Sequence, residues 1–159
     1  MLNEDNRDNI DIFYMKMAYL TSERATCVRR RVGSVITRDK MLLSSGYNGA
    51  PSGIEHCNKD TCIRLQMNIP SGEKPNLCIG SHSEINAIAQ AARNGVNINN
   101  STIYCTTFPC IYCAKAIVNA GIKRLVYCES YGNMEDPLTK KILQNITVDK
   151  ITKKEIFNS

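Results

Sequence analysis

Hydrophobic positions near the start of the chain repeat at a helical period. Ile12, Met15 and Tyr19 fall on one stripe of residues 8–25, whereas Lys16 falls elsewhere. Apolar residues three to four positions apart are typical of a helix with one buried face. We therefore expect an amphipathic helix over this segment.

The pattern then changes to short apolar runs. "VGSVIT" at 32–37 and "MLLSSGY" at 41–47 flank the polar turn "RDK", which predicts a β-hairpin. Residues 48–81 contain glycine, proline, serine and asparagine throughout and predict a long loop that contains cysteines. A loop of this length in a compact domain is usually functional or held in place by something.

From His82 onward, helical and strand-like segments alternate. The expected elements are a helix at 82–95, a strand at 101–107, a helix at 109–121, a strand at 123–129 and a helix at 136–145 that Asp136 caps. Strands that alternate with helices predict an α/β layered sheet. The last strand pairs should be parallel, because a helical crossover joins them.

Composition indicates a single soluble domain over residues 1–159. The chain has 43% apolar residues, which is enough for a compact core. Its first residues are polar and acidic, unlike a signal peptide, and no apolar run approaches the length of a membrane span. We therefore expect a cytoplasmic protein that does not bind membranes.

The net charge of +5 is too small to predict nucleic-acid binding by itself. The most concentrated basic run is Arg29, Arg30 and Arg31, which we interpret as a solvated basic face. Aromatic residues make up only 6% of the chain and tryptophan is absent, so few side chains are available to stack on unpaired bases.

The chain contains eight cysteines: Cys27, Cys57, Cys62, Cys78, Cys105, Cys110, Cys113 and Cys128. Without a secretory signal a disulfide framework is not expected, so metal binding and plain burial remain as explanations. Cys105 and Cys128 lie in strands among apolar neighbours, and we assign them to core packing.

Two predicted helix starts carry the residues of a metal site. Cys110 and Cys113 lie three positions apart, with Pro109 in the first turn of their helix, and His82 begins another helix. Two thiolates and one imidazole leave the fourth tetrahedral position of zinc to water, as in catalytic sites. Glu84, two residues after His82, is placed to take a proton from that water and pass it on. An N-terminal glutamate favoured by the helix dipole would explain Glu84 alone, but not the other three residues.

H-x-E followed by P-C-x-x-C is the signature of zinc-dependent nucleobase deaminases, and here the motifs are "HSE" at 82–84 and "PCIYC" at 109–113. The wider sequence resembles the deoxycytidylate (dCMP) deaminase family over about 26–129. The shared stretches are "CVRRRVGSVI", "GYNGAPSG", "ARNG", "TFPC" and "CAKAIVNAGIKRLVY". Ser83 departs from the alanine usual in the family.

The resemblance implies a three-layer α/β/α sandwich with a mixed sheet of about five strands, the cytidine deaminase-like fold. It implies hydrolysis of dCMP to dUMP and ammonia, which supplies dUMP for thymidylate synthesis. In the family, zinc-bound hydroxide attacks the ring carbon that bears the amino group, and the glutamate, here Glu84, shuttles protons.

Ligand contacts are also implied by the resemblance. Asn48 matches a position that binds the sugar, although asparagine before Gly49 is equally typical of a turn. Arg93 matches an arginine near the substrate phosphate in similar phage enzymes, although an exposed arginine at a helix end is the alternative explanation. Gly46, Tyr47, Asn48 and Gly49 match a regulatory nucleotide site, and family members are typically hexamers that dCTP activates and dTTP inhibits. Mg²⁺ would accompany the regulatory nucleotide.

Relatives with a similar loop carry a second, structural zinc. Cys27, Cys57, Cys62 and Cys78 match its ligands, and His56 is an alternative to one of them. Idle or buried thiols are the other explanation. Two other functions also stay open: deamination of a base within RNA or single-stranded DNA, and a non-catalytic zinc- or nucleotide-binding module.

Overall fold

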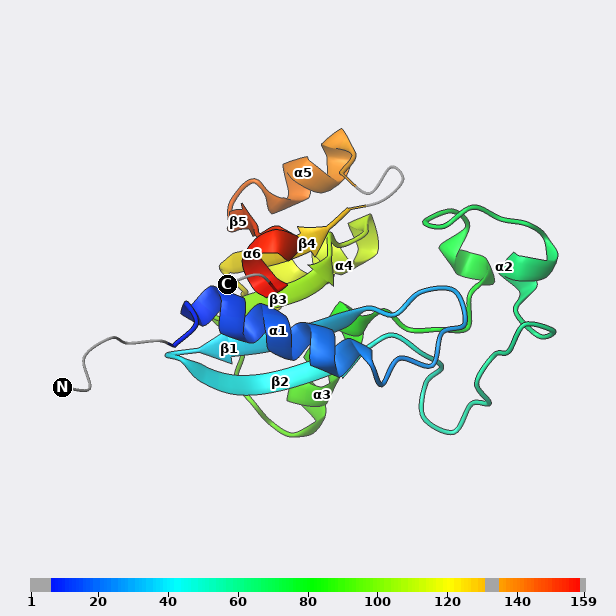
Figure 1. Ribbon diagram of the computed structural model, residues 1–159, viewed down its shortest axis with the longest axis horizontal. Helices are drawn as coiled ribbons and strands as arrows, with labels where there is room; N and C mark the ends of the chain where they lie inside the picture. The colour runs from blue at the N-terminus through cyan, green and yellow to red at the C-terminus, as the bar shows by residue number, and fades with distance from the viewer. Residues whose placement is uncertain (1–6, 131–134, 158–159) are drawn as a thin grey trace.

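The computed structural model describes residues 7–130 and 135–157 (Figure 1). The elements in chain order are α1 (Ile10–Ser22), β1 (Gly33–Arg38), β2 (Met41–Tyr47), α2 (Ile63–Gln66), the 3₁₀ helix η1 (Pro75–Leu77), α3 (Ser83–Arg93), β3 (Thr102–Thr107), α4 (Ile111–Asn119), β4 (Arg124–Glu129), α5 (Pro137–Leu143), β5 (Thr147–Lys150) and α6 (Lys153–Phe157).

The five strands form one mixed sheet in the order β2-β1-β3-β4-β5. β1 pairs antiparallel with both β2 and β3, whereas β3, β4 and β5 run parallel. This confirms the predicted hairpin and the parallel pairs that helical crossovers join. Because β3 and β4 are parallel, their carboxyl ends meet at one edge of the sheet, where α4 begins.

Helices cover both faces of the sheet, so the predicted three-layer sandwich is confirmed (Figure 1). Consecutive strand residues point to opposite faces and divide the core in two. In β1, Ile36 packs with residues of α3, α4 and α5, whereas Val35 packs with residues of α1 and α6. In β4, Leu125 and Val126 divide in the same way. Burial of Cys105 and Cys128 in these clusters confirms their assignment to the core.

The C-terminal segment contains one helix more than the sequence predicted. Asp136 caps α5 as expected, because its Oδ1 accepts hydrogen bonds from the backbone N–H groups of Leu138 and Thr139. After β5 the chain forms α6, whose Ile156 is fully buried beside α1. A five-residue helix is too short to show a helical period in the sequence.

Gly46 of β2 lets the site-bearing helix α3 pack directly on the sheet. A Cβ atom at this position would lie 2.3 Å from the carbonyl oxygen of Ser83 and 2.4 Å from the backbone nitrogen of Ala87. No side chain fits in that space. Glycine therefore fixes the distance at which the start of α3 lies from the sheet.

Residues 48–81 form the expected long loop, which extends away from the sheet (Figure 1). Its two short helices, α2 and η1, are the only helical segments in it among the described residues. The base of the loop is closed by a pair of backbone hydrogen bonds between Gly49 and Ser81, of 3.1 and 2.8 Å. This closure places Asn48 and His82 next to the edge of the sheet.

Within residues 7–130 and 135–157, no helix has the length and apolar character that a bilayer crossing requires.

Candidate metal centre and active site

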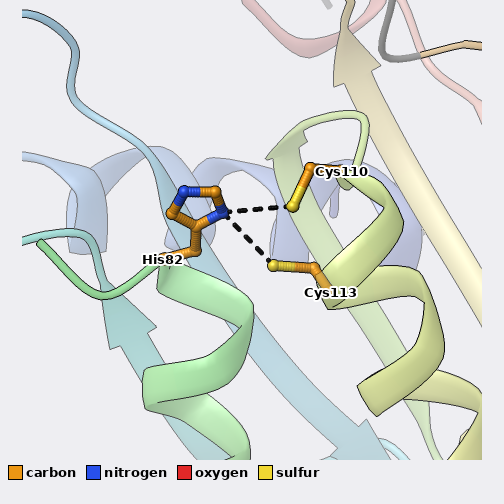
Figure 2. Close-up of side chains that lie close together, drawn as sticks. All are labelled: His82, Cys110 and Cys113. Carbon is orange, nitrogen blue, oxygen red and sulfur yellow. Dashed lines mark hydrogen bonds between the residues drawn. The ribbon is translucent and has the colours of Figure 1, made fainter. Parts of the chain in front are cut away.

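His82, Cys110 and Cys113 lie together at the starts of two helices (Figure 2). The Nδ1 atom of His82 is 3.4 Å from the Sγ atom of Cys110 and 3.4 Å from the Sγ atom of Cys113. All three ligand atoms lie within 4.8 Å of one another. The structure thus brings together residues that are separated by about thirty positions in the sequence.

The local structure of each helix start explains how these side chains converge. His82 is the N-cap of α3 and Cys110 is the N-cap of α4, and neither side chain caps its own helix. Both point instead into the space between the helices, where Cys113 of the first turn of α4 joins them. Pro109 lies before the N-cap and not in the first turn, which corrects the sequence-based prediction. Proline is compatible with either place because both are outside the hydrogen-bonded part of the helix.

The spacing of the three ligands fits zinc. With Zn–N and Zn–S distances of about 2.1 and 2.3 Å, tetrahedral nitrogen and sulfur ligands lie roughly 3.6 Å apart. The two observed N–S distances of 3.4 Å are close to this value. Three protein ligands also leave one coordination position free, as catalytic zinc requires.

One of the three ligands, Cys110, is already in the charge state that binds a metal, whereas the other two hold protons that a metal would displace. Hydrogen bonds from Cys113 and His82 lower the pKa of Cys110 to about 4, so this thiol is a thiolate at neutral pH. The Cys110 partner in turn raises the pKa of His82 to about 9. The hydrogen bond to Cys110 and burial raise the pKa of Cys113. A divalent cation would replace these shared protons and balance two thiolates.

Glu84 lies beside the metal ligands but is not one of them. Its side chain is buried, with 4% exposure, and burial raises the pKa of its carboxyl group. The hydroxyl group of Ser83 donates to Glu84 Oε2 over 2.9 Å. A buried carboxylate beside a metal site has the position and the raised pKa that suit a group that transfers protons.

Behind Glu84, the structure shows a hydroxyl pair that the sequence did not reveal. Ser83 Oγ and Ser34 Oγ are 2.7 Å apart, and both residues are fully buried. Ser34 Oγ also lies 3.3 Å from Cys105 Sγ. The contact joins β1 to α3 and therefore depends on the tertiary fold. The only sign of it in the sequence was the serine at position 83, where the family usually has alanine.

A cavity of about 440 Å³ opens onto this centre. Its volume is in the range of sites for small molecules. It is lined by His82, Glu84 and Cys110, by Phe108, Ile111 and Tyr112 of the α4 region, and by residues of the segment before β1 and of the long loop. One cavity therefore connects the metal centre with both the basic run and the long loop.

Asn48 lines this cavity, and its side chain also holds the chain in place. Its Oδ1 accepts from the backbone N–H of Val32 over 2.7 Å, and its Nδ2 donates to the carbonyl oxygen of Arg30 over 2.9 Å. The turn-like structural role and a place in the site are therefore compatible at this residue.

The other residues expected to bind ligands lie in different places. Arg93 is exposed in the last turn of α3, the opposite end from His82, and is not part of the cavity wall of this chain. The space beside Gly46 is occupied by α3, so its missing side chain serves helix packing. Tyr47 is exposed, and Gly49 lines the cavity.

The four cysteines expected to hold a second zinc all line the cavity. Burial and the nearby thiols of Cys62, Cys27 and Cys78 raise the pKa of Cys57, so the four lie in one neighbourhood. Within the described part of the chain, however, they do not reach the ligand spacing found at His82. His56 is exposed and lies outside the cavity wall.

Fold and site together define a class of protein: an α/β sandwich in which two helix starts offer one histidine and two cysteines to a metal beside a buried glutamate. A family model described as the cytidine and deoxycytidylate deaminase zinc-binding region matches residues 8–129. The chain therefore belongs to this zinc-binding deaminase family.

Individual relatives agree with this assignment. The chain is 40% identical to a deoxycytidylate deaminase of Schizosaccharomyces pombe over 87% of its length, and 34% identical to one of Enterobacteria phage T2 over 91%. It spans 42% of the yeast relative and 89% of the phage relative. The solved structure of the dCMP deaminase of cyanophage S-TIM5 with dCMP and dUMP is 29% identical. It matches 89% of this chain and 96% of its own, with a TM-score of 0.71.

Proposed function

We propose that this chain catalyses the hydrolytic deamination of dCMP to dUMP and ammonia. The observation that carries the proposal is the convergence of His82, Cys110, Cys113 and Glu84 at one end of a cavity of about 440 Å³. Support for the substrate comes from similar proteins that are named deoxycytidylate deaminases and from a similar structure solved with dCMP and dUMP.

In this proposal His82, Cys110 and Cys113 hold zinc. Zinc supplies Lewis acidity, which lowers the pKa of water enough to make it a nucleophile near neutral pH. The chain contributes the charge that stabilises the ion, through two cysteine sulfurs, and the orientation of the ligands, through two helices packed on one face of the sheet.

Glu84 moves the protons of the reaction. One water molecule replaces the amino group on the cytosine ring, the C–N bond breaks, and ammonia leaves. The Glu84 carboxylate moves two protons in turn: the first from the water to the ring nitrogen of the base, and the second from the new hydroxyl group on the ring carbon to the departing amino group. Burial, which raises the pKa of Glu84, makes this acceptance and release easier at neutral pH.

The mononucleotide would occupy the rest of the cavity. Asn48 lines the wall near the metal centre and is the proposed contact to the sugar. One further hydrogen-bonding direction remains at each end of an amide that already makes two bonds, as Asn48 does here. Phe108, which is 3% exposed, forms part of the apolar wall that would exclude water from the reacting base.

We also propose a second, structural zinc in the long loop, held by Cys27, Cys57, Cys62 and Cys78. The shared neighbourhood of the four thiols supports it, and so does the need of a long loop for an internal support. His56 is the weaker candidate because it lies outside the cavity wall. Zinc binding there would require the four sulfurs to come closer together than they lie in the structure.

Regulation and assembly complete the proposal. By resemblance to the family we expect a cytoplasmic hexamer that supplies dUMP for thymidylate synthesis, with dCTP as activator and dTTP as inhibitor, each with Mg²⁺. The expected regulatory segment, Gly46 to Gly49, includes the exposed Tyr47 at the end of β2. Arg93 is exposed on α3 and lies outside the cavity wall, so as a phosphate ligand it would serve the site of a neighbouring chain of the proposed hexamer.

One assay tests the activity. Ammonia release is measured from zinc-loaded protein with dCMP, deoxycytidine or a cytosine-bearing single-stranded DNA oligomer, each with and without dCTP. We expect turnover of dCMP and stimulation by dCTP. Activity on the oligomer but not on dCMP would overturn the mononucleotide assignment, and no activity on any substrate would favour a binding module.

A further inference from the structure

Four buried polar side chains form one line that ends at the proton-transfer group of the site. Cys105 and Ser34 lie opposite each other on the paired strands β3 and β1, and Ser83 and Glu84 belong to the first turn of α3. The first three are fully buried, and Glu84 is 4% exposed. The line therefore runs from the middle of the sheet to the start of the helix that His82 caps.

Each member of this line lies within hydrogen-bonding distance of the next. Ser83 Oγ donates to Glu84 Oε2 over 2.9 Å, and Ser34 Oγ lies 2.7 Å from Ser83 Oγ. Ser34 Oγ also lies 3.3 Å from Cys105 Sγ. Within residues 7–130 and 135–157, no side chain other than Ser83 makes a hydrogen bond to the Glu84 carboxylate.

The number of available protons decides the direction of these bonds. A serine hydroxyl has one proton to donate, and its oxygen accepts from other groups. When the Ser83 proton points to Glu84, Ser34 must donate to Ser83, so the Ser34 oxygen is left to accept from the Cys105 thiol. Burial and the nearby Glu84 raise the pKa of Cys105, so this thiol keeps its proton. The protons of the line then all point toward Glu84.

The opposite order of donors is less favourable. Ser83 would donate to Ser34 and Ser34 to the Cys105 sulfur, which is a weak acceptor, and the carboxylate would lose its hydroxyl partner. A hydrogen bond to a charged oxygen is about twice as strong as one between neutral groups. Buried donors in a row also strengthen one another. Donation from Ser34 to Ser83 therefore supports donation from Ser83 to Glu84.

Ser34 also restricts the rotation of the Ser83 side chain. Ser83 is the first residue of α3, and a serine side chain has several staggered rotamers. The bond from Ser34 holds the Ser83 Oγ atom where it reaches the carboxylate. Because β1 lies between β2 and β3, Ser34 itself has a fixed place in the sheet. The sheet thereby determines the orientation of a side chain on the helix.

We propose that Ser34 is a positioning residue of the deamination reaction, which acts through Ser83 to hold Glu84 in the orientation for proton transfer. Ser83 and Glu84 line the cavity, whereas Ser34 is not part of its wall and does not touch the substrate. This inference rests on the proposed function and deepens it, because it extends the reaction site from α3 into the sheet.

A double-mutant cycle of Ser34→Ala and Ser83→Ala tests the proposal. In the zinc-loaded protein, Ser34→Ala should lower kcat for dCMP by about twofold to fivefold, within the range of one neutral hydrogen bond, and leave KM unchanged. The double variant should have the kcat of Ser83→Ala, because Ser34 acts only through Ser83. Independent, multiplying losses in kcat would overturn the proposal.

Ser44→Ala is the matched control. Ser44 is also a buried serine of the sheet, and its hydroxyl donates over 2.7 Å to the carbonyl oxygen of Ala87 in the same helix α3. Loss of this bond should lower the thermal midpoint but leave kcat within about twofold, because the bond does not lead to Glu84. Equal losses of kcat in Ser34→Ala and Ser44→Ala would overturn the proposal, since they would indicate a general effect of α3 packing.

A conservative variant separates the hydroxyl group of Ser34 from the packing around it. Ser34→Thr keeps the hydroxyl but adds a methyl group at a fully buried position, so it should lower the thermal midpoint at least as much as Ser34→Ala. Its kcat should nevertheless stay within about twofold of the wild-type value. A kcat that follows the thermal midpoint, and not the presence of the hydroxyl, would contradict a positioning role. If Ser34→Thr does not fold, the double-mutant cycle decides.

The thermal midpoints of the metal-free proteins give a second reading of the cycle that does not depend on activity. Each single alanine leaves one buried hydroxyl short of a partner, whereas the double variant removes both hydroxyls. The double variant should therefore lose less stability than the sum of the single variants. Additive losses would show that the two hydroxyls are not coupled and would overturn the proposal.

Failure of this inference differs from failure of the proposed function. If the wild-type protein deaminates only deoxycytidine or the oligomer, the proposed substrate is wrong, and the cycle is measured with the substrate that is turned over. If it deaminates dCMP but Ser34→Ala keeps the full kcat, the proposed function stands and Ser34 is not a positioning residue. Absence of turnover with every substrate would overturn both.

Discussion

Two parts of this molecule gather cysteines, and they differ in what holds the sulfur atoms. Cys110 and Cys113 belong to a helix packed on the sheet, and their neighbour His82 begins another helix on the same face. Three of the four cysteines of the second group lie on the long loop, which lacks such support. The first group lies at ligand spacing, whereas the second does not in the described part of the chain.

The difference indicates where the fold is formed without the metal and where the metal itself stabilises the local structure. A site on packed helices is pre-organised by the hydrophobic core, so removing the metal should leave the fold intact. A site on a loop obtains its order from the metal itself, so binding and ordering occur together. Paired variants, one in each region, test this comparison.

The largest effect is expected from one cysteine in each group. Cys113→Ser should remove the catalytic zinc and reduce dCMP turnover below detection, with little change in the proteolysis of the loop. Cys62→Ser should remove the other zinc, keep measurable activity and increase cleavage between residues 48 and 81. Metal content by mass spectrometry and limited proteolysis check both. One zinc per wild-type chain would refute the second site.

The next effect compares two carboxylates of the cavity wall. Glu84→Gln should lower kcat by about 10²- to 10⁴-fold, the usual contribution of a general acid–base group, while zinc stays bound. Glu73→Gln, at an exposed loop residue, should leave kcat within about twofold, because no proton transfer is assigned to it. Steady-state kinetics measure kcat for both variants, and metal analysis measures whether zinc stays bound. Survival of activity in Glu84→Gln would contradict the proposed proton transfer.

A third comparison uses two glycines. Gly46→Ala places a Cβ against the backbone of α3 and should cost about 2–3 kcal/mol of folding free energy, as overpacking does. Gly53→Ala meets no atom within 4 Å and is strained only by its φ of +83°, so about 1 kcal/mol is expected. Urea unfolding measures both. Equal costs would mean that α3 adjusts freely to the sheet.

The smallest effect concerns the hydroxyl that contacts the catalytic carboxylate. Ser83→Ala removes one hydrogen bond to Glu84 and should lower kcat by about threefold to tenfold, with KM and zinc content unchanged. Ser71→Ala, in the exposed part of the cavity wall, is the control and should have no effect. A kcat equal to that of the wild type would show that Glu84 is held by other contacts.

The catalytic part of the site was predictable because its signals are local. His82, Cys110 and Cys113 each stand at a helix start that the sequence marks, and only their meeting required the fold. The sheet and most helices followed from periodicity for the same reason. α6 was missed because its buried residue, Ile156, stands in a segment too short and too charged to show a pattern.

The remainder of the site depends on contacts between distant segments. Nothing in a run of three arginines indicates which side chains line a cavity, because the backbone of this run is held by contacts such as that of Asn48, 18 residues after Arg30. The contact between Ser34 and Ser83 joins a strand to a helix 49 residues later. Such contacts form only through tertiary packing, and a single sequence contains almost no signal from which they can be predicted.

The backbone pair between Gly49 and Ser81 has a consequence for how this chain can change. It joins the two ends of the long loop at its base, so residues 50–80 form an appendage whose size does not alter the distance between Asn48 and His82. The entropy cost of loop closure rises slowly, by only about 0.6 kcal/mol for each doubling of length. Segments of different length can therefore be joined at this junction without moving Asn48 or His82, while the part of the cavity wall that the loop supplies changes with the segment.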